Sequence, residues 1–213
     1  EKLEKENADQ KIEEHHILAR EVASESITLL KNDNNILPIT KEKYKDIAVI
    51  GEFAVNPRYQ GNGSSEVKPT KLDNVLEIIQ DEYGNEFNIK YSRGYDLKDD
   101  NNLSYIDDAT MKAKNSDIVL VFAGLPLHYE SEGIDRTHIN MPKSHNRLID
   151  EINKVNPNSV IILTNGSAVS MPWINNTPAI VESWLGGQAG AGGTADVLFG
   201  NVNPSGKLAE TFP

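Results

Sequence analysis

The chain has 213 residues, and 32 acidic residues against 21 basic ones give it a formal net charge of −11. An acidic chain argues against nucleic-acid binding, which needs a basic face to displace counterions from phosphate. No stretch approaches the roughly 18 apolar residues that are needed to cross a bilayer. Hydrophobic residues make up 38% of the chain, enough for a globular core. We therefore expect a globular protein whose partners include neither nucleic acid nor a membrane.

The chain contains no cysteine, which excludes disulfides, thiolate nucleophiles and cysteine-ligated zinc or iron–sulfur clusters. This absence leaves both a cytoplasmic and an exported bacterial location open and favours the first. The chain begins with Glu1 rather than Met and stops at Pro213 without a charged tail. We therefore expect it to be a piece of a longer polypeptide.

The first predicted elements are helical. Residues 1–11 are polar and charged, which indicates a linker or a helix extension. From Ile12 to Lys31 the apolar residues follow the spacing of one helix face, and the run of Asn and Asp at 32–35 ends the pattern. Helices are predicted further on at about 72–83, 105–114, 144–155 and 191–199.

Short apolar runs alternate with these helices and predict strands. They lie at 47–51, 87–91, 117–123, 159–164 and 179–184, with a possible edge strand at 208–212. The alternation predicts an α/β fold, a doubly wound, mostly parallel sheet of five or six strands with helices on both faces. We expect residues 1–14 to be an extension and residues 15–213 to form one domain.

The loops that leave the predicted strands are long or rich in glycine, whereas the loops that enter them are short. In open α/β sheets ligands bind outside the carboxyl ends of the strands, so we expect the site there. The loop 124–143 holds most of the titratable candidates, namely His128, Glu130, Glu132, Asp135, Arg136 and His138. A carboxyl group in a partly dry rim can have a raised pKa and act as a general acid.

Several interpretations of this loop stay open at this point. Arg136 could orient one carboxylate while another donates its proton. The loop could instead be an ion-paired segment with a structural role only, or a metal site with His128 and His138 among its ligands. The glycine-rich loops match neither G-x-G-x-x-G nor G-x-x-x-x-G-K-[ST], which argues against a small flavodoxin-like nucleotide-binding protein.

Eight segments, in order along the chain, together resemble one known family. They are AREVASESITLLKN (19–32), ILPI (36–39), IAVIG (47–51), PRYQGNGSS (57–65), ESEGIDR (130–136), MPW (171–173), GGQAGAGG (186–193) and DVLFGNVNPSGKLAETFP (196–213). The family is glycoside hydrolase family 3, which includes β-glucosidases and β-xylosidases, and the similarity is to its C-terminal α/β-sandwich domain. It runs from about residue 15 to the end, with a departure from the family's usual Pro-Gly-Gln-Glu-Gly-Gly at 186–189.

The resemblance implies a retaining β-glycosidase, a β-glucosidase in the first place, that removes terminal β-linked sugars from an oligosaccharide or aryl glycoside. An Asp on a (β/α)8-like barrel domain would attack the anomeric carbon, and a Glu on the sandwich domain would protonate the departing oxygen. Two carboxyl groups about 5–5.5 Å apart are required for this mechanism. Since the barrel is absent from this chain, we expect the chain to fold alone but not to hydrolyse glycosides. The resemblance implies neither a metal nor an organic cofactor.

The family's E-G-x-D-R pattern places the acid/base residue on Glu132, with Glu130 as its competitor. Asp135 and Arg136 match the same pattern and would brace the loop. A serine of the G-x-G-S segment would reach the sugar, which points to Ser64 with Ser65 beside it. The alternative is a noncatalytic carbohydrate-binding or scaffold domain, which would keep the fold without needing Glu132.

Overall fold

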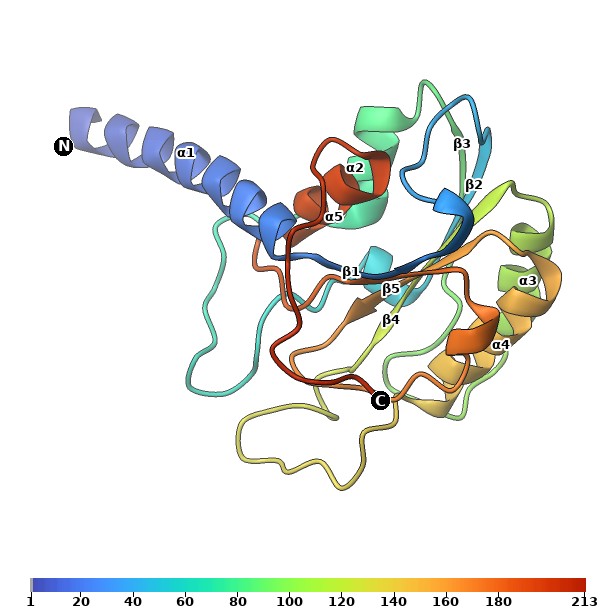
Figure 1. Cartoon of the computed structure of the whole chain (residues 1–213). Helices are drawn as coiled ribbons and strands as arrows, with labels where there is room; N and C mark the ends of the chain where they lie inside the picture. The colour runs from blue at the N-terminus through green and yellow to red at the C-terminus, as the bar shows by residue number, and fades with distance from the viewer. Residues whose placement is uncertain (1) are drawn as a thin grey trace.

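The computed structural model describes the backbone of residues 2–213 and the side chains of residues 10–213. Six strands form one sheet in the order β1-β6-β5-β4-β2-β3 (Figure 1). The strands are β1 (Thr28–Asn32), β2 (Asp46–Ile50), β3 (Asn88–Ser92), β4 (Ile118–Gly124), β5 (Ser159–Thr164) and β6 (Ala179–Glu182). The helices are α1 (Lys2–Ser26), α2 (Val75–Tyr83), α3 (Ile106–Lys114), α4 (Lys143–Val155) and α5 (Gly190–Phe199), with short 3-10 turns η1 (Asp33–Asn35), η2 (Glu52–Ala54) and η3 (Ile174–Asn176).

The sheet is mostly parallel and covered on both sides, which confirms the predicted α/β fold class. All pairs from β3 to β6 are parallel, and every residue of the two central strands β4 and β5 is buried. Helices α2 and α5 lie on one face, with the end of α1 beside α5, and helices α3 and α4 lie on the other (Figure 1). Burial on both faces is the reason why these strands appear in the sequence as unbroken apolar runs.

The edge of the sheet beside β6 differs from the sequence prediction in two ways. The first helix was expected to reach Lys31, but it ends at Ser26, and the next residues form β1, antiparallel to β6 with Thr28 opposite Glu182. The β-branched Thr28 suits a strand, and Ile27, which precedes it, is buried. The possible edge strand at 208–212 is also wrong: the two edges of the sheet are β1 and β3, and residues 208–212 form no strand.

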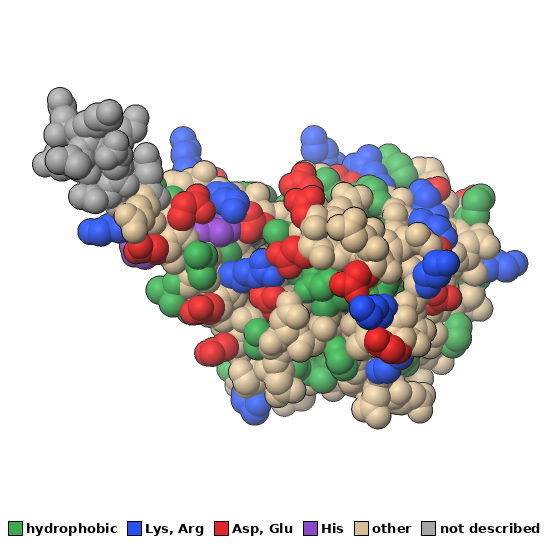
Figure 2. All heavy atoms as spheres, turned by 90° about the horizontal axis from the view of Figure 1, so that it is seen from above, with side chains coloured by type: hydrophobic (Ala, Val, Ile, Leu, Met, Phe, Trp, Pro, Cys, Tyr) green, Lys and Arg blue, Asp and Glu red, His purple; other side chains and the backbone are tan. Residues whose placement is uncertain are grey.

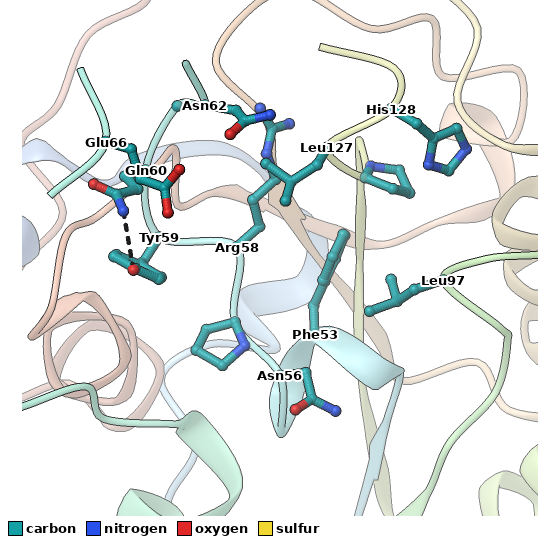
Figure 3. A pocket seen from close by; sticks show the side chains of 13 residues that line it. Phe53, Asn56, Arg58, Tyr59, Gln60, Asn62, Glu66, Leu97, Leu127 and His128 are labelled. Carbon is teal, nitrogen blue, oxygen red and sulfur yellow. Dashed lines mark hydrogen bonds between the residues drawn. The ribbon is translucent and has the colours of Figure 1, made fainter. Parts of the chain in front are cut away.

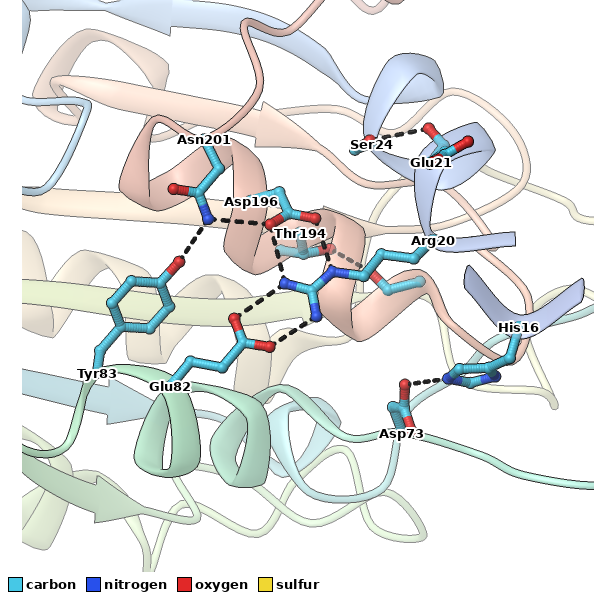
Figure 4. A network of polar contacts seen from close by, with 11 residues as sticks. His16, Arg20, Glu21, Ser24, Asp73, Glu82, Tyr83, Thr194, Asp196 and Asn201 are labelled. Carbon is cyan, nitrogen blue, oxygen red and sulfur yellow. Dashed lines mark hydrogen bonds and ion pairs between the residues drawn. The ribbon is translucent and has the colours of Figure 1, made fainter. Parts of the chain in front are cut away.

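Helix α1 is attached to the body of the fold by charged side chains (Figure 4). Arg20 donates from Nε to Asp196 Oδ2 at 2.7 Å and from Nη1 to Glu82 Oε1 at 2.6 Å, so it joins α1 to α5 and α2. His16 Nε2 lies 2.7 Å from Asp73 Oδ2. From above, acidic and basic side chains are interspersed over this face (Figure 2).

Helix α1 begins N-terminal to the predicted Ile12. The expected extension, residues 1–14, therefore lies in α1 as far as the described backbone goes, and a domain boundary after residue 14 stays a prediction. No helix within the described residues is both long and apolar enough to cross a membrane.

Candidate functional site

The candidate residues gather at the carboxyl edge of the parallel strands, where the sequence predicts a site. The loops after β2, β4, β5 and β6 meet there and line an open groove. We call it the Glu132 groove; its walls are residues 58 and 61–62, residues 130–132 and 134–136, Gly166 and Leu185. The long loops after β2 and β4 bring together residues that are about 70 positions apart in the chain.

Glu132 lies exposed in this groove and is oriented by Ser64. The Ser64 N–H and Oγ–H both donate to Glu132 Oε2, at 2.6 and 2.7 Å. The close approach needs glycine at position 63, where φ is +97° and an added Cβ would collide with the Glu132 carboxylate. The two donors, the Ser64 hydroxyl first, lower the pKa of Glu132 below its ordinary value. Within the described residues Glu132 Oε1 accepts no hydrogen bond, so this oxygen is free to meet a ligand.

Glu130, two residues earlier, has a different environment. Its carboxylate accepts hydrogen bonds from Arg58 Nη1 at 2.7 Å, from the Gly166 N–H at 2.9 Å and from the Ser167 hydroxyl. Burial by itself raises the pKa of Glu130, but the donors Ser167, Gly166 and Arg58 together outweigh it and lower the pKa. Both oxygens are therefore engaged, and this side chain holds the loop against the β5–β6 connection.

Arg58 is the residue that the sequence analysis missed. Its side chain is only 4% exposed, and its guanidinium also donates to the carbonyls of Leu125, at 2.6 Å, and Glu130, at 2.8 Å. It thus fixes both ends of the short segment that leads to Glu132. The sequence left open that Arg136 orients one of the carboxylates. Arg136 donates to Ser167 Oγ at 2.7 Å and to the Ala168 carbonyl at 3.1 Å, which braces the loop, and it pairs with no carboxylate of the described residues.

The other candidates from the sequence lie apart from this contact. Ser65 and Asp135 are exposed, and no hydrogen bond joins either to Glu132 within the described residues. His128 Nε2 lies 3.5 Å from Asp100 Oδ2, and the His138 ring packs 6.2 Å from the ring of Tyr129. In the described part of the chain no three His, Asp or Glu residues are grouped closely enough to hold a metal ion.

A third carboxyl group, Glu182 at the end of β6, is completely buried. Its Oε1 accepts from the Trp184 N–H at 2.8 Å, and its Oε2 accepts from Asn165 Nδ2 at 2.9 Å. Burial raises the pKa of Glu182 to about 8, and the negative charge of Glu130 adds to the effect. Asn165 also donates to the Ser167 carbonyl at 3.0 Å, which connects Glu182 to the loop that holds Glu130.

Comparisons with known proteins show which family the chain belongs to. A model of the glycosyl hydrolase family 3 C-terminal domain matches residues 27–213. The chain is 51% identical over 210 residues to thermostable β-glucosidase B of Acetivibrio thermocellus, covering 98% of this chain and 28% of the relative. It is 42% identical over 213 residues to an exo-α-(1→6)-L-arabinopyranosidase of Bifidobacterium longum, covering 95% and 28%.

A solved structure, the family 3 β-glucosidase of Bifidobacterium adolescentis, matches with a TM-score of 0.87 at 44% identity, covering 95% of this chain and 29% of that one. The chain thus spans a little over a quarter of the length of these relatives. The family match over residues 27–213 and the likeness in sequence and structure confirm the resemblance found in the sequence, and the chain belongs to glycosyl hydrolase family 3 as its C-terminal domain.

Proposed function

We propose that this domain supplies Glu132 as the acid/base residue of a retaining β-glycosidase, in the first place a β-glucosidase. The observation that carries the proposal is the contrast between the two neighbouring carboxylates. Glu130 has both oxygens engaged, whereas Glu132 stands in the open groove with Oε1 free. A group that exchanges protons with a substrate needs such a free oxygen within hydrogen-bond reach.

In the first step Glu132 gives its proton to the glycosidic oxygen as the bond to the anomeric carbon breaks and a nucleophilic carboxylate bonds to that carbon. In the second step Glu132 takes a proton from water, whose oxygen bonds to the anomeric carbon as the bond to the nucleophilic carboxylate breaks, and the sugar is released. No residue of this chain is assigned the nucleophile's role. We place it on a barrel domain of the same polypeptide, in the portion of the relatives' length that this chain does not span.

The pKa of Glu132 has to serve both steps. The two Ser64 donors favour its ionised form, which suits the water-activating step. The acid step needs a higher pKa. A second carboxylate about 5–5.5 Å away and exclusion of water by the facing domain both act in that direction. The domain contact is therefore part of the proposed mechanism and not only a cover for the groove.

The test uses the full-length protein that contains this domain, with p-nitrophenyl β-glucoside and β-xyloside as substrates. We expect Glu132→Gln to lose about 10²–10⁴-fold in kcat on these substrates, because the water of the second step then lacks its general base. On the activated aryl substrates azide should restore turnover and form a glycosyl azide, since azide needs no general base. Glu130→Gln is the matched control. It weakens the contacts that hold the loop, so azide should not restore the activity that this variant loses.

Full activity of Glu132→Gln would refute the assignment, and azide rescue of Glu130→Gln alone would move the role to Glu130. A wild-type protein without activity on any aryl glycoside would favour a noncatalytic carbohydrate-binding domain. Hydrolysis by the 213-residue chain alone, abolished by Glu132→Gln, would show that no second domain is needed.

A further inference from the structure

A second hollow opens at the same edge of the sheet, on the other side of the 58–62 segment. We call it the Leu127 pocket. It has a volume of about 280 Å³, and its lining combines apolar Phe53, Leu97 and Leu127 with polar Asn56 and His128 (Figure 3). Arg58, Gly61 and Asn62 line both this pocket and the Glu132 groove, so the two hollows share a wall.

The size and lining of the pocket indicate the kind of ligand. Its volume is just below the range of about 300–1,000 Å³ that drug-sized ligands occupy, which suits a single ring. Apolar walls suit the face of a sugar ring or an aryl ring. Asn56 Nδ2 already donates to Glu52 and His128 Nε2 lies 3.5 Å from Asp100 Oδ2, so Asn56 Oδ1 and His128 Nδ1 are the atoms that face hydroxyl groups of a ligand. The one buried cation, Arg58, is already neutralised by Glu130. The lining therefore favours a neutral ligand over an anionic one.

The pocket is largely preformed. Gln60 Nε2 donates to the Val67 carbonyl at 2.8 Å, and the Val67 N–H donates back to Gln60 Oε1 at 3.0 Å, which closes the loop on one side of the pocket. Phe53 is buried and packs edge-on against Tyr95 with ring centroids 5.9 Å apart. Leu127, by contrast, is 49% exposed and is the one apolar wall that a ligand could cover substantially.

The wall that the pocket shares with the Glu132 groove indicates its role. A general acid protonates the oxygen of the leaving group, and the nucleophile attacks from the opposite face of the sugar that stays behind. The leaving group therefore lies on the side of the acid. We propose that the Leu127 pocket holds this leaving group, a neutral six-membered ring, while Glu132 protonates the glycosidic oxygen. The inference rests on the proposed function and adds the site that selects the leaving group.

The test compares three substrates of the full-length protein. Cellobiose has a sugar ring as its leaving group, phenyl β-glucoside has an aryl ring, and methyl β-glucoside has none. We measure the ratio of kcat/KM for each ring substrate to that for methyl β-glucoside, in wild type and in Leu127→Trp, which fills the pocket. We expect at least one ratio to fall roughly tenfold, through KM, since groups of this size in an apolar pocket contribute such factors.

Leu127→Ala is the second variant, in case the larger side chain disturbs folding, and it should lower the same ratio by removing a wall. Ile139→Trp is the matched control because Ile139 is 44% exposed on the same β4–α4 connection and lines neither hollow. A fall for cellobiose alone identifies a sugar site, and a fall for phenyl β-glucoside alone an aryl site.

Unaltered ratios in both Leu127 variants would overturn the inference. This holds equally if activity falls by the same factor on all three substrates, because the pocket would then seat another part of the polypeptide. Glu132→Gln, assayed on methyl β-glucoside, tests the proposed function separately. If it loses activity while the Leu127 ratios do not move, the acid/base assignment stands and only the leaving-group site is wrong.

Discussion

The buried carboxyl group of Glu182 allows a prediction whose size follows from the structure. Its pKa is about 8 in the folded chain, because burial disfavours the charged form, against an ordinary value of 4.5. Between these two values the unfolded chain releases a proton that the folded chain keeps. The stability associated with the protonated Glu182 is therefore fully present below pH 4.5 and is lost as the pH rises to about 8. At about 1.4 kcal/mol per pH unit the loss amounts to about 5 kcal/mol.

The perturbation is Glu182→Gln, which has a similar shape and does not titrate. The free energy of unfolding of the variant minus that of wild type should rise with pH by about 5 kcal/mol between pH 4.5 and 8, and should be flat at lower pH. Because the other titrating groups contribute equally to both proteins, their contributions cancel in this difference. Asn165 Oδ1 is buried without a hydrogen-bond partner among the described residues, and a rotated Asn165 amide can accept from the new Gln side chain at the cost of its hydrogen bond to the Ser167 carbonyl, a cost that does not depend on pH.

The assay is urea unfolding of the 213-residue chain at a series of pH values, followed by tryptophan fluorescence. Glu151→Gln is the control: the Lys154 side chain lowers the pKa of this partly exposed residue, so its contribution to stability is lost as the pH falls and the trend has the opposite sign. A Glu182→Gln difference that does not change with pH would refute the reasoning, because it would mean that Glu182 is ionised in the folded chain.

Three further predictions concern the loop that holds Glu132. Arg58→Ala should lower the free energy of unfolding by about 3 kcal/mol, since it leaves Glu130 without its cation; a loss below about 1 kcal/mol in urea unfolding would contradict this. Ser64→Ala should raise the pKa of Glu132 by removing its hydroxyl donor. The basic limb of the pH profile of kcat/KM in the full-length protein should therefore move to higher pH, and an unmoved limb would refute this prediction. Gly63→Ala should lower kcat because its Cβ displaces the Glu132 carboxylate, at a cost in stability of about 1–3 kcal/mol from the positive φ; unchanged kcat would count against the orienting role of Ser64.

The sequence predicts the central sheet well because burial on both faces leaves a local signal. Strands β4 and β5 are continuous apolar runs, and nothing outside those runs is needed to recognise them. Strand β1 carries no such signal. Its residues continue the apolar spacing of α1, and its strand conformation depends on pairing with β6, about 150 residues away in the chain.

In the candidate site, too, features with a local sequence pattern could be predicted, whereas contacts between distant segments could not. The E-G-x-D-R pattern points to Glu132 and the G-x-G-S pattern to Ser64, and the structure joins the two by hydrogen bonds. The role of Arg58 could not be predicted in this way, because no spacing rule relates it to Glu130, 72 positions later. Arg136 was the natural choice from the sequence because it lies in the same loop as the carboxylates.

The three carboxyl groups near the groove differ in charge for reasons that depend on one another. Glu130 is ionised because Arg58, Gly166 and Ser167 donate to it, and its negative charge helps to keep the buried Glu182 protonated. If Glu182 ionised, its negative charge would lie near that of Glu130. Asn165 donates to both Glu182 and the Ser167 carbonyl, so a change at Glu182 would also affect the loop whose Ser167 hydroxyl holds Glu130. Arg58 offsets one carboxylate and protonation removes another, so Glu132 is the remaining uncompensated negative charge of the three. That balance suits a site where one carboxylate exchanges a proton with an uncharged sugar.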